Sequence, residues 1–241
     1  MYFLDKSNTF EYSEWLKTAE SEGAAVLIDK EKNWTSFDVV AKLRSLTKIK
    51  KIGHAGTLDP LATGLLIVCL SKATKEIYRF QDLGKAYIGI IRLGATTKTD
   101  DSEAEEENIL PYEYISVDKI KEVVESFSGE ILQCPPKYSA KKVGGKRMYR
   151  LARENKPIEV KPVGVNIYRL EITNIDLPLI NIEVECSKGT YIRALARDIG
   201  ERLGCGGYLK ELRRSSIGSY NVINALKINE IIKLHEHFSF I

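Results

Sequence analysis

The chain has 241 residues and a formal net charge of +3, with 44% hydrophobic and 29% charged residues, as in an ordinary globular protein. Its apolar runs stay well below the roughly 18 residues of a membrane span, and its N-terminus lacks the basic start and apolar stretch of a signal peptide. The sequence therefore shows neither a membrane-span pattern nor a signal-peptide pattern. We therefore expect a cytoplasmic protein whose four cysteines are reduced and structural and bind no metal.

Residues 1–22 are polar and predict an N-terminal extension, in which Trp15 and its apolar neighbours indicate one amphipathic helix. Thr35 and Ser36 offer an N-cap, and apolar residues recur after them at helical spacing, which predicts a helix over 36–47. Short apolar runs in the same half of the chain predict strands at 24–28, 64–70 and 85–93.

Residues 100–107 hold six acids in eight positions, so we expect a solvated loop over 100–111. Helical spacing of apolar residues predicts a helix over 117–127. The stretch 129–161 is long and rich in turn residues, and we predict no regular element in it. Its part 137–161 has nine lysines and arginines against two glutamates. Such a charge attracts a phosphate backbone, although a solvated basic face is the alternative.

Alternation of apolar and polar residues predicts paired strands at 163–175 and 179–186. A turn then leads into a helix whose apolar face runs from Ile192 to Leu203. Further strand structure is expected at 208–222 and a closing helix at 228–234. Because strands and helices alternate without a strict βαβ rhythm, we predict an α/β (α+β) fold with a mixed, mainly antiparallel sheet flanked by helices.

The strongest chemical signal is the run GHAGTLDPLATG over residues 53–64, of which 53–63 is expected to form a loop. Asp59 precedes a proline, which biases its backbone toward an extended conformation, and the glycines let a ligand approach closely. The buried strand that follows would anchor the loop. On physical grounds alone an ordinary Asp-Pro turn is the favoured explanation of these residues, and the sequence lacks the phosphate-loop, nucleophilic-serine and zinc motifs.

This run resembles the catalytic motif of the TruB-type bacterial tRNA pseudouridine synthases, which act on uridine 55 in the T-loop. The resemblance covers about residues 23–222 and recurs in order in the stretches Leu27–Lys30, Lys85–Tyr87, Pro136–Ala140, Cys186–Arg193 and Leu212–Arg214. It implies a pseudouridine synthase catalytic domain over 23–241, with 137–161 as a basic RNA-gripping segment and no PUA domain. It also implies a cofactor-free isomerase that extrudes its target base and binds the T-arm of tRNA as a monomer, with no obligatory protein partner.

The resemblance assigns roles residue by residue. Asp59 matches the catalytic aspartate, Arg193 the arginine that pairs with it, and Tyr87 the tyrosine that stacks on the base and can exchange a proton at C5. The residues that it places in substrate binding are His54, Tyr191, Leu212 and Lys30, the last as a support for the catalytic loop. The residues that it places on the RNA backbone are Lys141, Lys142, Lys146, Arg147 and Arg150.

Two alternatives stay open at this point. One is a guide-RNA-dependent relative of the snoRNP type, against which the absence of a PUA domain counts. The other is a tRNA-binding or tRNA-folding factor whose catalysis is secondary. One departure from the family concerns residues 29–34, which read DKEKNW where the family often has DKPxG. The sequence does not decide whether Asp59 attacks the sugar carbon C1′ or removes a sugar proton.

Overall fold

The computed structural model describes residues 1–139, 142–143, 145–154 and 160–239. Its internal contacts divide the chain into two compact units: unit 1 comprises Met1–Tyr87 and Arg213–Ile241, and unit 2 comprises Ile88–Leu212. Two strands, β5 (Lys85–Leu93) and β13 (Gly207–Ile217), contribute residues to both units. The catalytic domain expected over 23–241 therefore consists of two units, and the N-terminal extension is part of the first.

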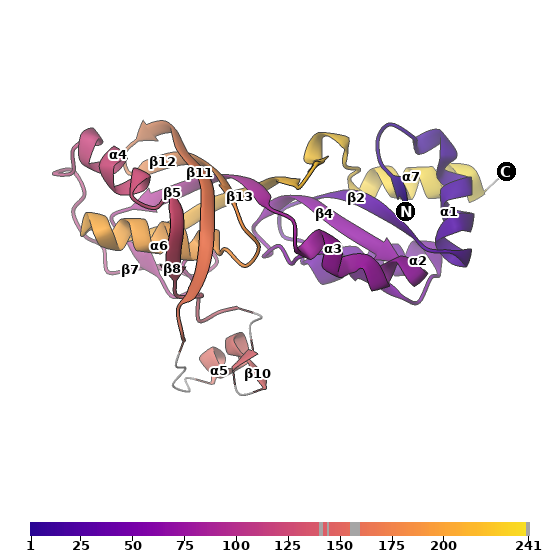
Figure 1. Ribbon diagram of the computed structural model, residues 1–241, viewed down its shortest axis with the longest axis horizontal. Helices are drawn as coiled ribbons and strands as arrows, with labels where there is room; N and C mark the ends of the chain where they lie inside the picture. The colour runs from indigo at the N-terminus through magenta and orange to yellow at the C-terminus, as the bar shows by residue number, and fades with distance from the viewer. Residues whose placement is uncertain (140–141, 144, 155–159, 240–241) are drawn as a thin grey trace. The chain divides into compact units, whose positions relative to one another are not determined.

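The other strands of unit 1 are β1 (Tyr2–Leu4), β2 (Ala24–Lys30), β3 (Ile52–His54), β4 (Thr63–Leu70) and β14 (Tyr220–Asn221). They lie in the order β1-β2-β4-β13, with β3 paired to β4 and β14 to β13. Of these strands, Figure 1 labels β2, β4 and β13. Strand β4 runs antiparallel to β2 and β3 but parallel to β13. The sheet of unit 1 is therefore mixed, and β4 leads away from the loop that carries Asp59.

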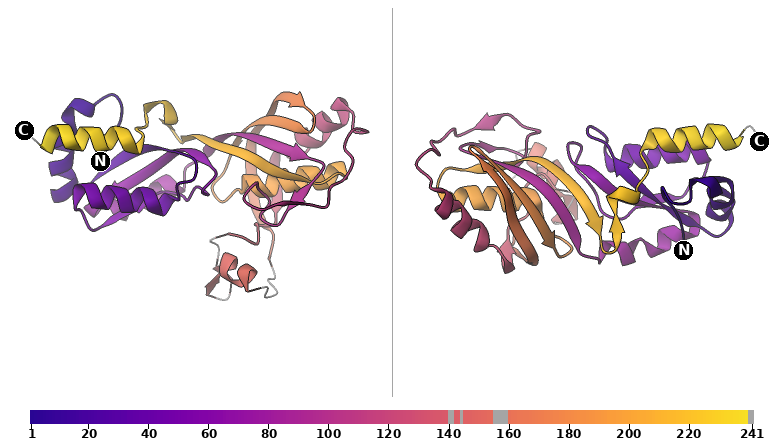
Figure 2. Two further views of the ribbon diagram at one scale, coloured as in Figure 1. Left: turned by 180° about the vertical axis from the view of Figure 1, so that it is seen from behind. Right: turned by 90° about the horizontal axis from the view of Figure 1, so that it is seen from above.

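Helices α1 (Tyr12–Ser21), α2 (Ser36–Thr47) and α7 (Ile228–Ser239) share one hydrophobic cluster with this sheet. Helix α7, yellow in Figure 2, contacts both α1 and α2. A second cluster contains residues of α3 (Ile77–Gln81) and of the 3₁₀ helix Ser71–Glu76. Val26 and Ile28 of β2 belong to the first cluster and Leu27 to the second, so the two-residue period of the strand separates two cores.

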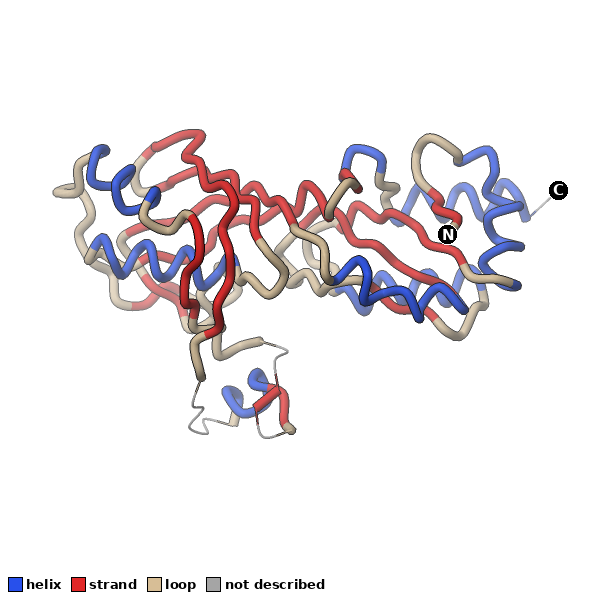
Figure 3. The backbone as a smooth tube through the Cα atoms, in the orientation of Figure 1, coloured by secondary structure: helices blue, strands red, loops and turns tan. Residues whose placement is uncertain are grey.

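The sheet of unit 2 has the order β13-β5-β12-β11-β8, where β8 is Gly129–Gln133, β11 is Val163–Asp176 and β12 is Leu179–Cys186. Strand β11 is antiparallel to both of its neighbours. Helices α4 (Val117–Glu125) and α6 (Ile192–Leu203) pack against each other, and α4 also contacts β11 (Figure 3).

Two small strand pairs complete unit 2: β6 (Thr96–Thr97) with β7 (Glu106–Glu107), and β9 (Lys142–Val143) with β10 (Lys146–Arg147). The short helix α5 (Met148–Arg153) follows β10. Within the described part of the chain, no helix is both long and apolar enough to cross a bilayer.

The predicted mixed sheet flanked by helices is confirmed, as are the predicted helices and the strands at 24–28, 64–70, 85–93, 163–175 and 179–186. Helix α2 occupies the predicted range, and Thr35 caps it as expected: its hydroxyl accepts the amide of Asp38, whose carboxylate accepts the amide of Thr35. The predicted N-terminal helix is α1, whose Trp15 is fully buried.

Three expectations are wrong. The stretch 129–161 contains regular structure, including β8, which is stabilised by pairing with β11. Local sequence does not reveal this strand, because its Leu132 is 77% exposed and the alternation of apolar and polar residues is lost. The loop expected over 53–63 starts later, since β3 extends to His54 and pairs with β4. The loop over 100–111 is not simply solvated: Asp101 is fully buried, and Glu106 and Glu107 form β7.

Candidate active site

Asp59 lies half-buried on the loop between β3 and β4. The residue before it, Leu58, is held by Ser36 at the first turn of α2. The Ser36 hydroxyl accepts the Leu58 amide at 2.9 Å and donates to the Leu58 carbonyl at 3.1 Å, and Ser36 is 2% exposed. Because both backbone groups of Leu58 are bound to one buried side chain, the backbone leading into Asp59 is fixed.

Lys30, the last residue of β2, holds the other side of the loop. It is fully buried, and its ammonium donates to the carbonyls of Trp34 at 2.6 Å, Glu31 at 3.1 Å and Pro60 at 3.2 Å. The amide of Asn33 donates to the same Pro60 carbonyl at 2.8 Å. These contacts hold the loop that carries Asp59 against the end of β2.

Arg214 links the loop to β13. It is 1% exposed, and its guanidinium donates to the carbonyls of Leu65 at 2.7 Å and Gly56 at 3.1 Å. Gly64 has φ +102°, and a Cβ there would lie 2.3 Å from the Arg214 carbonyl oxygen, so only glycine fits. Burial, and then the charge of Arg214, lower the pKa of His54. His54 is therefore neutral near pH 7.

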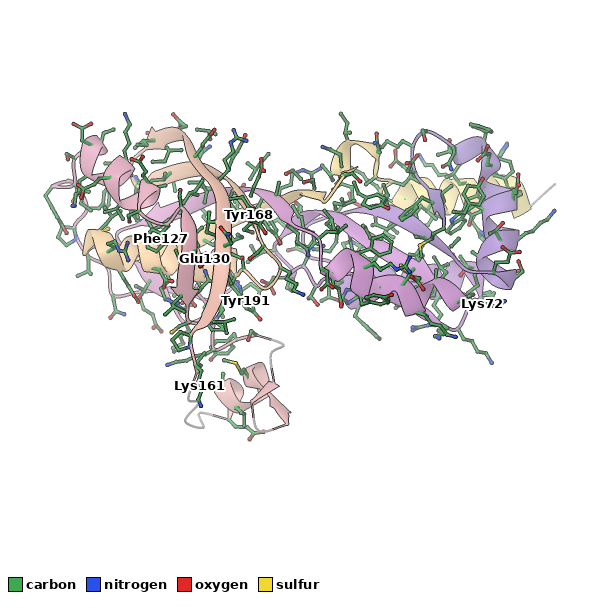
Figure 4. The ribbon with its side chains drawn as sticks, viewed as in Figure 1. Lys72, Phe127, Glu130, Lys161, Tyr168 and Tyr191 are labelled. Atoms are coloured by element: carbon green, nitrogen blue, oxygen red, sulfur yellow. The ribbon has the colours of Figure 1, made fainter. Side chains whose placement is uncertain are left out.

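The remaining predicted site residues are divided between the units. Tyr87 is half-buried on β5 and belongs to unit 1, with His54 and Asp59. Tyr191, labelled in Figure 4, directly precedes α6 and is partly buried. Leu212 is partly buried on β13, and like Tyr191 and Arg193 it belongs to unit 2. The predicted pairing of Asp59 with Arg193 joins residues of different units and stays a prediction.

Arg193 lies in the first turn of α6 and is bound within unit 2. Its guanidinium donates to the carbonyls of Thr99 at 2.9 Å and Tyr138 at 3.1 Å, and its Nη1 lies 3.2 Å from Oδ2 of Asp101. The buried carboxylate of Asp101 thus faces a buried guanidinium. Sequence reasoning missed Asp101 because it stands in an acidic run that is typical of solvent-exposed loops.

Arg197 follows one turn later on α6 and pairs with the neighbouring acid. Its guanidinium binds Oδ2 of Asp100 at 2.9 Å, Oδ1 of Asp198 at 2.7 Å and the carbonyl of Cys134 at 3.0 Å. Burial raises the pKa of Asp100, and the nearby arginines oppose this shift. Two consecutive acids of the acidic run therefore pair with two arginines on one helix.

The predicted RNA-backbone residues fall in the basic segment. Lys141 lies outside the described residues. The backbones of Lys142, Lys146 and Arg147 lie in β9 and β10, and that of Arg150 in α5. The structure leaves the side chains of these four residues undescribed.

A second basic surface lies in unit 1. A cavity of about 510 Å³ is lined by five lysines together with Glu20, Thr47, Ile49 and Ser71. We call it the lysine cavity, and its lysines are Lys48, Lys50, Lys51, Lys72 and Lys75. Lys48, Lys50 and Lys51 lie between α2 and β3, while Lys72 and Lys75 lie in the 3₁₀ helix after β4.

The chain matches two family descriptions that adjoin in sequence. The TruB family pseudouridylate synthase N-terminal domain matches residues 44–192, and the tRNA pseudouridylate synthase B C-terminal domain matches residues 193–238. The tRNA pseudouridine synthase B of Parabacteroides distasonis is 48% identical over 87% of this chain and 92% of its own length. That of Flavobacterium johnsoniae is 48% identical over 86% of this chain and 93% of its own length.

The chain is also similar to a solved structure at lower identity. A chain in the structure of an H/ACA RNP bound to a substrate RNA containing 2′-deoxyuridine is 25% identical, with a TM-score of 0.70. The match covers 93% of this chain and 57% of that one. The family matches span most of the chain and include every predicted site residue except Lys30. The chain therefore belongs to the TruB family of pseudouridylate synthases and is an isomerase.

Proposed function

We propose that this chain converts uridine 55 in the T-loop of tRNA to pseudouridine, with Asp59 as the catalytic carboxylate. One observation carries the proposal: in a chain of this family, Asp59 is half-buried on a loop whose neighbouring residues are fixed by Ser36 and Lys30. The names of the relatives with 48% identity support tRNA as the substrate.

The proposed reaction breaks the bond between N1 and C1′, turns the base and joins C1′ to C5. C5 loses a proton and N1 gains one, so substrate and product are isomers and no cofactor is consumed. Asp59, in its ionised form, attacks C1′ or removes a proton from the sugar. Arg193 keeps Asp59 ionised by pairing with it, and Tyr87 stacks on the base and exchanges the proton at C5.

The target base has to leave the folded T-loop before it can react, which costs a few kcal/mol of stacking. In the proposal, Tyr191 and Leu212 line the pocket that receives the base. His54 fills the space that the extruded nucleotides leave. A neutral His54 suits this role because a protonated imidazole there would be repelled by the positive charge of Arg214.

The basic segment 137–161 and the lysine cavity are the surfaces that we propose for the RNA backbone. Lysines bind phosphate as mobile point charges without reading the base sequence. In the lysine cavity, the five lysines face one acid, Glu20, so the surface favours an anion. The T-arm would be held by these contacts while the site residues select the uridine.

The test is incubation of the purified chain with an unmodified tRNA transcript and no guide RNA, followed by mapping of pseudouridine. We expect one pseudouridine, at position 55, and none in a matched transcript with cytidine there. Product that forms only when guide RNA is added would indicate the guide-dependent alternative. Tight binding without product would indicate the folding factor instead.

A further inference from the structure

Gln133, the last residue of β8, is 1% exposed and makes two hydrogen bonds to the backbone of Tyr191. Its Oε1 accepts the Tyr191 amide at 2.8 Å, and its Nε2 donates to the Tyr191 carbonyl at 3.1 Å. A side-chain amide that pairs with both backbone groups of one residue acts as a strand partner would. The backbone of Tyr191 is thereby anchored to the sheet of unit 2.

Tyr191 is the N-cap residue of α6, with φ −104° and ψ 109°, and its side chain makes no capping hydrogen bond. Its carbonyl also accepts the amide of Leu195 at 3.1 Å, which begins the helix. Just before it, the chain turns through Gly189 at φ +82°. Because the Tyr191 side chain does not cap the helix, the hydrogen bonds from Gln133 are the contacts outside the helix that hold its backbone.

The chain that follows Gln133 is also attached to α6. Arg197 donates to the carbonyl of Cys134 at 3.0 Å, and Arg193 donates to the carbonyl of Tyr138 at 3.1 Å. The segment from Gln133 to Tyr138, which leads from β8 into the basic segment, is therefore held at three points by residues 191–197. Two of these three residues, Tyr191 and Arg193, are predicted site residues.

We propose that Gln133 is a positioning residue, which fixes the backbone of Tyr191 and so sets the orientation of the Tyr191 ring. This inference rests on the proposed function, in which Tyr191 lines the pocket that receives the uridine. The role needs an amide: a glutamate in its charged form has no donor for the Tyr191 carbonyl, and a leucine has neither donor nor acceptor.

The chain offers a matched control, because it has two glutamines and the other, Gln81, is exposed at the end of α3. We would compare Gln133→Leu, Gln133→Glu and Gln81→Leu by single-turnover pseudouridine formation with saturating protein, and by tRNA affinity. For Gln133→Leu we expect the rate constant to fall about tenfold or more while the Kd for tRNA changes less than about threefold. Gln81→Leu should match the unmodified chain.

A double-mutant cycle with Tyr191→Ala separates positioning from general destabilisation. If Gln133 acts through Tyr191, the double variant should be about as slow as Tyr191→Ala alone. The inference would be overturned if the rate losses of the two single variants multiplied in the double variant. A rate for Gln133→Leu within about twofold of the unmodified chain would overturn it as well. Should Gln133→Leu fail to fold, the cycle uses Gln133→Glu, which keeps the volume and one hydrogen bond. If the unmodified chain forms no pseudouridine, the proposed function fails and the inference with it.

Discussion

Nη1 of Arg193 lies 3.2 Å from Oδ2 of Asp101, and the two side chains are 8% and 1% exposed. The carboxylate is itself fixed, because its Oδ1 accepts hydrogen bonds from the Thr99 hydroxyl and the Glu103 amide. A buried pair of this kind restricts where the guanidinium can point and sets the charge around it. Asp101 therefore fixes the position of Arg193, the arginine that we propose to pair with Asp59.

Asp101→Asn should slow the reaction without releasing the RNA. The change keeps the shape of the side chain but removes the negative charge that pairs with Arg193. We expect the rate constant to fall about tenfold, which is about 1.4 kcal/mol in activation free energy. Single-turnover kinetics and filter binding of tRNA measure the two effects. Glu105→Gln, at an exposed position of the same acidic run, is the control. An equal loss in both variants would mean that the net charge of the loop matters and the pair does not.

Ser36→Ala should loosen the loop that carries Asp59. It removes both hydrogen bonds to the buried backbone of Leu58, which should lower the free energy of unfolding by about 1–3 kcal/mol. The rate of pseudouridine formation should fall as well, because the carboxylate is no longer fixed. Urea unfolding and single-turnover kinetics check this against Ser45→Ala, an exposed serine on the same helix. Full activity in a destabilised Ser36→Ala variant would show that the hydrogen bonds between Ser36 and Leu58 serve stability alone.

His54 should make the folded chain less stable in acid. Its pKa in the folded chain is below the ordinary value of 6.5, so as the pH falls through 6.5 the unfolded chain takes up the proton first. The contribution of His54 to the free energy of unfolding is complete above pH 6.5. It declines as the pH falls below 6.5, until His54 is protonated in the folded chain as well. Thermal unfolding from about pH 8 to about pH 5 should therefore show a smaller loss of Tm for His54→Asn than for the unmodified chain. The exposed His237→Asn is the control, and identical pH profiles for all three would contradict the assignment.

The lysine cavity should contribute phosphate contacts. Replacing Lys50 and Lys72 by alanine should weaken tRNA binding, and the slope of log affinity against log salt should become shallower by about 0.7 to 0.9 for each lost contact. Lys233→Ala, at an exposed position of α7, should leave the slope unchanged. An unchanged slope in the double variant would place the RNA backbone elsewhere.

The fold was largely predictable because most elements have a clear period. The limits predicted for β5 and α2 match the observed ones. For α2, the apolar spacing and the Thr35 cap indicate the same start. Strand β8 could not be predicted, since its Leu132 is exposed and its stability comes from β11, far away in sequence. The division into two units likewise depends on long-range contacts that no local pattern reveals.

The residues of the proposed site could be selected from the sequence where they stand in recognisable motifs, but the residues that contact them could not. Asp59, Tyr87 and Arg193 came from stretches that resemble a family, and composition alone would not have selected them. Asp101 was hidden in an acidic run, and Gln133 ends a short strand that was not expected. Residues that act by holding a backbone or a charge have no local signature, because their function lies in a contact between distant parts of the chain.

The most direct test of Asp59 as the catalytic carboxylate is single-turnover conversion of unmodified tRNA by Asp59→Asn, with the Kd for the same tRNA measured in parallel. Asp176→Asn, at an exposed position at the end of β11, serves as the matched control. We predict that Asp59→Asn forms no detectable pseudouridine at position 55 and binds tRNA within about threefold of the unmodified chain, while the control behaves normally. Measurable turnover by Asp59→Asn, or loss of tRNA binding together with activity, would contradict the assignment.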